Sequence, residues 1–258
     1  MNTLRAEWTK LRTLPGTGWL LLGVVVATVI VSATVSASLS CTSTAACHPD
    51  ITKLSLTGTY LGQAVVAIVA VLAVSGEYST GMIRATLAAM PHRTTVLAAK
   101  AAVVSAVTLA AGAVAVLGSV LAGRLILPGH GYTPANGYPV LSLANATVLR
   151  AAAGTVLYLA LIALLSLGVA TAVRDSAVAI GSVLGLLYLF PILAAVVGGA
   201  GVQRHLEQIG PMTAGLEIQA STGLRHLPIS PWAGLGVLAA WAAAALLAGG
   251  LLLRLRDA

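Results

Sequence analysis

The sequence predicts an all-α integral membrane protein with six transmembrane helices, an N-terminal interfacial helix and both termini in the cytoplasm. Three observations support this fold class. Of the 258 residues, 58% are hydrophobic and only 8% are charged, which is too little polar surface for a soluble protein of this length. Apolar runs of roughly the 20 residues that a helix needs to cross a bilayer recur along the chain. The Lys and Arg residues lie at the ends of these runs.

Six apolar runs are the predicted spans, and together they form one transmembrane domain over residues 1–258. They are residues 18–39, 54–75, 98–123, 151–173, 176–200 and 232–253. The first run is longer than the apolar region of a signal peptide, so we expect it to be retained as a helix. Six spans and their loops leave no room for a nucleotide-binding domain. The polar segment before the last run has the mixture of charged and apolar residues that short amphipathic helices need.

The segment before the first span has the pattern of an interfacial helix. Leu4, Trp8 and Leu11 recur at i, i+4 and i+7, so a helix places them on one face with the charged residues off it. Such a helix lies on the lipid bilayer with its Trp among the headgroups. The alternative, which the residues leave open, is a basic flank without structure that orients the first span.

The distribution of basic residues predicts the orientation of the chain. One side of the six-span arrangement takes nine of them: Arg5, Lys10, Arg12, Arg84, Arg93, Lys100, Arg174, Arg254 and Arg256. The other side takes five: Lys53, Arg124, Arg150, Arg204 and Arg225. Because the side richer in Lys and Arg faces the cytoplasm, both termini and the central loop are predicted to be inside.

The loop after the first span contains both cysteines of the chain, Cys41 and Cys47. The predicted topology places them outside the cell, where a disulfide persists. We therefore expect a disulfide between them. The alternative is two free thiols in the loop, since closing so small a loop stabilises little.

Several classes of function are disfavoured by what the spans lack. No Asp, Glu or His lies well inside a predicted span, whereas ion-coupled transporters and intramembrane hydrolases need such groups there. The five histidines lie in loops without metal-site spacing, so we expect no metal and no catalytic residue. The motif G-x-x-x-x-G-K-[ST] is absent, so we expect no nucleotide cofactor in this chain. The net charge of +7 forms no basic stripe, so we expect no nucleic-acid partner.

Small residues and one amide are notable within the spans. The spacing G-x-x-x-G, which lets helices approach closely in lipid, occurs at Gly58–Gly62 and at Gly181–Gly185. Gly is so frequent in this chain that chance matches are expected. Gln63 has two interpretations, because its side chain can line a pathway or bond across to another helix.

The central segment, residues 76–100, gathers charge, aromatic residues, Gly and Pro between two long apolar runs. A short helix over residues 77–87 would present anchors and a charged contact to a protein partner. The anchors are Tyr78, Met82 and Ile83, and the charged contact is Arg84. The alternative is an ordinary loop whose basic residues only set topology, with Glu77 paired to a neighbour.

This segment resembles the loop after the second span in permease subunits of type-2 ABC transporters. The residues that carry the resemblance are Glu77, Gly81, Leu87, Pro91, Arg93, Leu97 and Lys100. Met82 departs from it, since many members have Thr there. The G-E-Y-S-T-G-M-I-R run and the E-W-T-K-L-R run near the N-terminus look like permeases of high-GC Gram-positive bacteria. The resemblance implies that Glu77, Tyr78, Gly81, Met82, Ile83 and Arg84 belong to a coupling helix that docks on a cytoplasmic ABC ATPase subunit.

The expected function is that of the membrane-spanning subunit of an ATP-driven ABC exporter in a bacterial plasma membrane. A second permease copy or a paralogue would complete the translocation path. ATP hydrolysis is expected on the partner subunit, so this chain is not expected to be an enzyme. The alternative is a non-transport polytopic membrane protein that acts as an assembly or signalling partner through the same loop.

Overall fold

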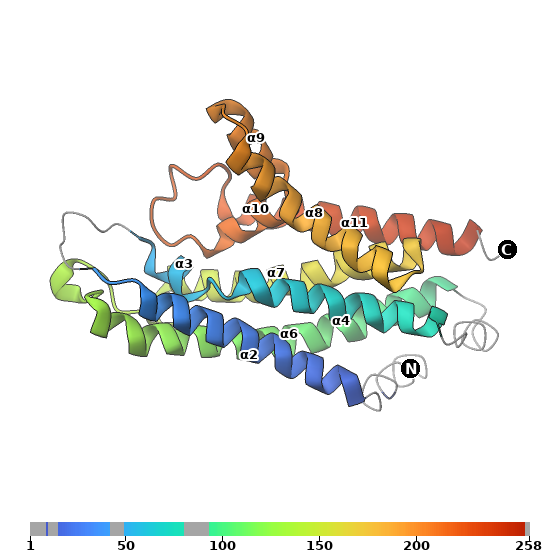
Figure 1. Ribbon diagram of the computed structural model, residues 1–258, viewed down its shortest axis with the longest axis horizontal. Coiled ribbons are helices and arrows are strands. Elements are labelled where there is room, and N and C mark those ends of the chain that lie inside the picture. Colours follow the sequence, from blue (N-terminus) through green and yellow to red (C-terminus); the bar gives the residue numbers. More distant parts are fainter. Residues whose placement is uncertain (1–8, 10–14, 42–48, 80–92, 256–258) are drawn as a thin grey trace.

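The computed structural model describes residues 9, 15–41, 49–79 and 93–255, and its elements in these ranges are all helical (Figure 1). Six of the helices are long and apolar enough to cross a membrane. They are α2 (Pro15–Ser38), α4 (Thr59–Ser79), α6 (Arg93–Ile126), α7 (Ala146–Val173), α8 (Ser176–Val196) and α11 (Pro231–Leu255). The all-α prediction is thereby confirmed over the described residues, and six helices of this length and composition indicate a multi-pass membrane protein.

The second span differs most from its predicted bounds of 54–75. Its beginning is divided into a short helix α3 (Ile51–Ser55) and a turn, and α4 starts only at Thr59. The turn brings Gly58 against α2, where its backbone N–H donates to the Ser32 hydroxyl at 3.0 Å. At its other end α4 continues to Ser79, so Glu77 lies in the helix and not in a loop.

Capping residues explain other differences in bounds. The first helix starts at Pro15, because proline lacks only an N–H that has no helical partner in the first turn. The fourth span starts at Ala146, five residues earlier than predicted, because the Asn145 side chain accepts from the Thr147 N–H. The fifth span ends at Val196 and not at residue 200.

Two short helices follow α8, as predicted for the polar segment. Helix α9 (Ala200–Ile209) has no buried residue, whereas α10 (Pro211–Leu216) buries most of its side chains in the bundle. A 3₁₀ turn, η3 (Glu217–Gln219), continues α10. The Trp241 indole of α11 donates to the Ile209 carbonyl at 3.0 Å, which fixes the junction between α9 and α10. Part of the polar segment, α10 with η3, therefore returns to the bundle, whereas α9 and the loop before α11 stay at the surface.

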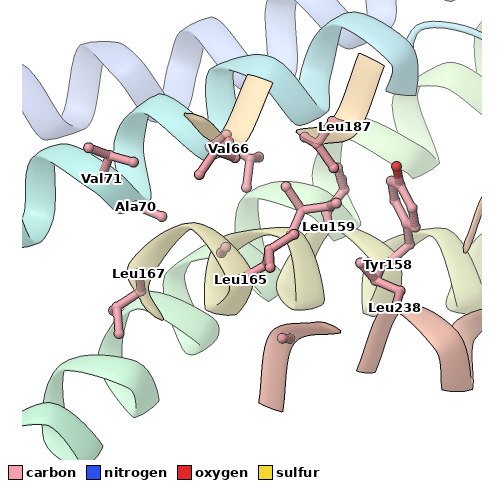
Figure 2. Close-up of a cluster of buried hydrophobic side chains, with 14 of the residues drawn as sticks. Val66, Ala70, Val71, Tyr158, Leu159, Leu165, Leu167, Leu187 and Leu238 are labelled. Carbon is pink, nitrogen blue, oxygen red and sulfur yellow. The ribbon is translucent and has the colours of Figure 1, made fainter. Parts of the chain in front are cut away.

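Helix α7 lies at the centre of the bundle. Figure 2 shows Tyr158, Leu159 and Leu165 of α7 among side chains from three other helices. Those neighbours are Val66, Ala70 and Val71 of α4, Leu187 of α8 and Leu238 of α11. Because lipid is as apolar as these side chains, close packing and not exclusion of water must hold the helices together. The helices around α7 leave many apolar side chains exposed, as lipid contact requires.

Close helix packing uses one of the two G-x-x-x-G spacings. A Cβ atom added at Gly58 would lie 1.9 Å from the Thr28 carbonyl oxygen of α2, and one at Gly62 would lie 2.2 Å from the Thr28 hydroxyl. No atom of the described residues lies within 4 Å of a Cβ atom added at Gly181 or Gly185. The first spacing is therefore a packing contact within this chain, whereas the second makes no such contact in the described structure.

This difference predicts opposite outcomes for the same substitution. Gly58→Ala should lower the free energy of unfolding by about 1–3 kcal/mol, because the methyl group must displace the backbone of α2. The matched control Gly181→Ala should leave stability unchanged or raise it slightly, since Ala favours a helix. Thermal unfolding of the purified protein in detergent measures both. Equal effects of the two substitutions would contradict the packing role of Gly58.

Candidate functional site

A buried ion pair joins α4 to α6 beside the segment 80–92. Glu77 lies in the last turn of α4 and Lys100 in the second turn of α6, and the Lys100 Nζ atom is 3.0 Å from Glu77 Oε1. Their side chains are 10% and 7% exposed. Lys100 Nζ also donates to the Ala73 carbonyl at 3.1 Å. The pair therefore joins the last turn of α4 to the second turn of α6.

Burial makes this pair costly unless both charges stay matched. Among the residues whose burial the structure describes, Glu77 and Lys100 are the charged residues that are buried. Removing two charges from water costs several kcal/mol for each ion, and only close geometry with further hydrogen bonds offsets that cost. Loss of one partner would leave the other as an unmatched buried charge. The pair is thus a specific constraint on how α4 and α6 meet.

A second contact extends this constraint to the turn between α7 and α8. The Arg174 guanidinium lies 5.4 Å from the centre of the Tyr78 ring, within the range of a cation–π contact. Arg174 ends α7 in the left-handed region with φ of 69°, and its N–H donates to the Ala170 carbonyl. Asp175 then caps α8 by accepting from the Val178 N–H at 2.8 Å. Helices α4, α6, α7 and α8 are thereby connected at this end of the bundle.

The predicted coupling residues fall into two groups. Glu77 and Tyr78 lie within α4 and make the contacts just described. The pairing of Glu77 with Lys100 agrees with the alternative in which Glu77 pairs with a neighbour. Gly81, Met82, Ile83 and Arg84 lie outside the described residues, and their docking role stays a prediction. The same holds for the interfacial residues Leu4, Trp8 and Leu11. In the sequence, the signal for the Glu77–Lys100 pair is Lys100 itself, because a Lys within an apolar run needs a partner on another helix.

Gln63 bonds across to other helices in the middle of the bundle. The Tyr158 hydroxyl donates to Gln63 Oε1, and Gln63 Nε2 lies 3.1 Å from the Met212 sulfur and 3.4 Å from the Tyr188 hydroxyl. The Tyr188 hydroxyl donates to the Tyr60 carbonyl at 2.5 Å. Both ends of the amide are used, so the interhelical interpretation of Gln63 fits its contacts. The network joins α4, α7 and α8 to α10.

At the opposite end of the bundle, Asp50 is a centre of hydrogen bonds. Its carboxylate caps α3 by accepting from the N–H groups of Thr52 at 3.0 Å and Lys53 at 3.2 Å. It also accepts from the Ser221 N–H, from the Ser221 hydroxyl at 2.6 Å and from the Thr222 N–H at 2.9 Å. Burial alone raises the pKa of Asp50, but the bonds from Ser221, Thr222 and Lys53 outweigh it and lower that pKa. Asp50 therefore stays ionised near neutral pH.

Two further contacts hold the same segment. Lys53 Nζ lies 3.3 Å from the Glu217 carboxylate, in a pair whose side chains are 35% and 15% exposed. The Arg150 guanidinium of α7 donates to the Ala220 carbonyl. A surface cavity of about 460 Å³ lies beside Lys53 and Tyr60. The sequence does not reveal this site, because its two halves lie far apart in the chain.

Of the two cysteines predicted to form a disulfide, the structure describes only Cys41. Cys41 is disulfide-bonded and buried, and its N–H donates to the His130 carbonyl at 2.9 Å. Cys47, the other cysteine of the chain, lies outside the described residues, so the pairing stays a prediction. Over the part of the chain that the structure describes, no three His, Cys, Asp or Glu residues are grouped as a metal would require.

Comparison with known proteins adds no assignment. Neither the models of known protein families nor the curated proteins contain a match to this chain. The family expectation therefore depends on the residues of the central segment, and its structural context is the set of contacts around Glu77.

A charge swap tests the buried pair. Glu77→Lys should lower the free energy of unfolding by about 3–5 kcal/mol, because it leaves two buried cations together. The double variant Glu77→Lys/Lys100→Glu should recover most of that loss, as measured by thermal unfolding in detergent. Glu207→Lys, on the half-exposed surface of α9, is the control and should change stability by less than about 1 kcal/mol. A swap that recovers nothing would contradict the pairing.

Proposed function

We propose that this chain is the membrane-spanning subunit of an ATP-driven ABC exporter, which docks on a separate cytoplasmic ATPase through the segment after α4. The observation that carries the proposal is the buried Glu77–Lys100 pair at the two ends of that segment. A loop that transmits force must be attached stiffly to the spans, and this pair joins the spans on either side of the segment.

The contacts around the pair supply a route for such force. Movement of the segment displaces α4 and α6 together, since the ion pair joins their ends. The contact between Tyr78 and Arg174 extends the displacement to the turn between α7 and α8. Helix α7 is the most enclosed helix of the bundle and packs against α4, α6, α8 and α11. A push on the central segment would therefore reach the helices around the core.

The division of labour among the coupling residues follows from their positions. Glu77 and Tyr78 brace the helix ends inside the bundle, and in this proposal the contacts to the ATPase come from Gly81, Met82, Ile83 and Arg84. The interfacial residues Leu4, Trp8 and Leu11 would hold the start of the chain against the lipid bilayer. ATP hydrolysis belongs to the partner subunit, and this chain needs no cofactor of its own.

The orientation is part of the proposal. Figure 1 places the start of α2, the end of α4, the start of α6 and the end of α11 at one end of the bundle. Of the nine basic residues counted as cytoplasmic, Arg93 and Lys100 lie near the start of α6, Arg254 near the end of α11 and Arg174 in the turn between α7 and α8, and the other five lie outside the described residues. By the bias of Lys and Arg toward the cytoplasm, this end is inside and Asp50 is outside. A second permease copy or a paralogue would complete the path through a bacterial plasma membrane.

An Arg→Glu substitution tests the docking role when it is made at Arg84 and, as a control, at Arg225. Arg84→Glu puts a like charge against the site that should accept Arg84, which costs several kcal/mol at an interface. Co-purification with a P-loop ATPase from a neighbouring reading frame and stimulation of its ATP hydrolysis should both fall at least tenfold.

The matched control is Arg225→Glu, in the exposed loop before α11, which should leave both readouts unchanged. Equal behaviour of the two variants would remove the docking role. A neighbouring reading frame without G-x-x-x-x-G-K-[ST] would favour the non-transport assembly or signalling role instead.

Labelling from the two sides of the membrane tests the orientation. A single reactive cysteine at position 92 should react with an impermeant maleimide only from the cytoplasm, because it lies in the central segment. One at position 225 should react only from outside, since Arg225 is exposed in the loop before α11. Labelling of both positions from the same side would overturn the six-span topology.

A further inference from the structure

The segment 217–222 lies at the Asp50 end of the bundle, where charged side chains from distant parts of the chain hold it. Asp50, Lys53 and Arg150, which lie far from it in the chain, supply charged groups that bond to it. Its N-terminal neighbour is the buried helix α10, and its C-terminal neighbour is an exposed loop that begins with Gly223 at φ of 63°. No atom of the described chain lies within 4 Å of a Cβ atom added at Gly223. The segment is thus anchored on one side and open on the other.

We propose that residues 217–222 are a lid that opens and closes as a unit and that Asp50 is the latch that holds it shut. The lid is a property of this chain alone. Only its use, release of cargo at the outer face, rests on the proposed function.

The closed lid contains buried polar groups that have no protein partner among the described residues. Gln219 is completely buried, and neither its amide oxygen nor its amide nitrogen has a hydrogen-bond partner among the described residues. The Nε atom of Arg150, whose guanidinium bonds to Ala220, is also buried without a partner in the same part of the chain. These groups add no hydrogen bond within the described protein to the closed state. The closed state therefore needs compensating contacts elsewhere in the lid.

Two contacts provide that compensation. Ile218 is completely buried in a slot made by Gly154 of α7, where an added Cβ atom would lie 2.0 Å from the Ile218 side chain. Asp50 accepts from two backbone N–H groups and one hydroxyl of the lid, and hydrogen bonds to an ionised group are the strong ones. Loss of the Asp50 charge leaves the Gly154 slot intact and weakens only the latch.

The latch is placed where movement of α4 would release it. Asp50 is the cap of α3, and only the turn at residues 56–58 separates α3 from α4. The Ser221 N–H and hydroxyl must stay within bonding distance of Asp50 for the lid to remain shut. A displacement of α3 that separates these groups would therefore release the latch.

Hydrogen exchange tests the lid on the purified full chain in detergent, without an ATPase. Asp50→Asn should speed exchange of the backbone amides of residues 217–220 at least tenfold, because the whole lid opens more often. The matched control is Asp175→Asn, which also removes an aspartate helix cap but lies outside the lid and its contacts. It should leave exchange in residues 217–220 unchanged.

A disulfide across the latch tests the same motion in the other direction. The Ser221 hydroxyl lies 2.9 Å from the Thr52 hydroxyl, so Thr52→Cys/Ser221→Cys places two sulfur atoms within bonding reach. Oxidation of this variant should slow exchange in residues 217–220 at least tenfold, and reduction should reverse it. The two single variants under the same redox conditions control for reduction of the native disulfide.

The outcomes distinguish a lid that moves as a unit from a local hydrogen bond. If Asp50→Asn changes only the amides of Ser221 and Thr222, Asp50 is a local acceptor and the lid does not move as a unit. If the oxidised double variant exchanges as fast as its reduced form, the lid proposal fails even where Asp50→Asn folds poorly. Loss of ATPase docking in Arg84→Glu would leave both lid measurements as they are, so the lid and the exporter role fail independently.

Discussion

Within a bilayer, a polar group has to find its partner inside the protein, and this constraint places the polar contacts of the chain. Several buried hydroxyls bond back to the carbonyl one turn earlier, as Thr28, Ser75 and Thr155 do. Groups too large for that solution pair across helices. Gln63 uses both ends of its amide on three neighbouring elements, and Lys100 binds both Glu77 and the Ala73 carbonyl. The bundle is therefore held in register by a few directional contacts within an otherwise apolar interface.

Hydropathy predicts the number of spans because the cost of a charge in lipid exceeds every local preference. It does not predict where a helix begins or ends. Asn145 extends α7 toward its N-terminus through a side-chain cap, and the turn at Gly58 shortens α4 because its backbone must fit against α2. The charge of Glu77 predicts a loop, yet this residue lies in α4 because Lys100 neutralises it. That pairing joins two helices, and no periodicity within one helix reveals it.

The candidate sites differ in how visible they are in the sequence. The central segment is visible because its charges interrupt two apolar runs, and its Glu77 and Lys100 brace the bundle. Asp50 is less visible, although an aspartate two residues before a threonine is an ordinary helix cap. Its cap contacts to the N–H groups of Thr52 and Lys53 are therefore the only contacts of Asp50 that the sequence predicts. Its bonds to Ser221 and Thr222 depend on the return of α10 into the bundle, which no local pattern predicts.

Helix α4 connects these sites because it has a polar contact at each level of the bundle. Glu77 joins it to α6 at one end, Gln63 joins it to α7, α8 and α10 in the middle, and α3 continues it to Asp50 at the other end. A helix of 21 residues is about 30 Å long and moves as a rigid rod, since bending it breaks backbone hydrogen bonds. A displacement at Glu77 is therefore felt at Gln63 and at Asp50. Because Met212 of α10 bonds to Gln63 and the lid follows α10, both attachments of the lid depend on the position of this one helix.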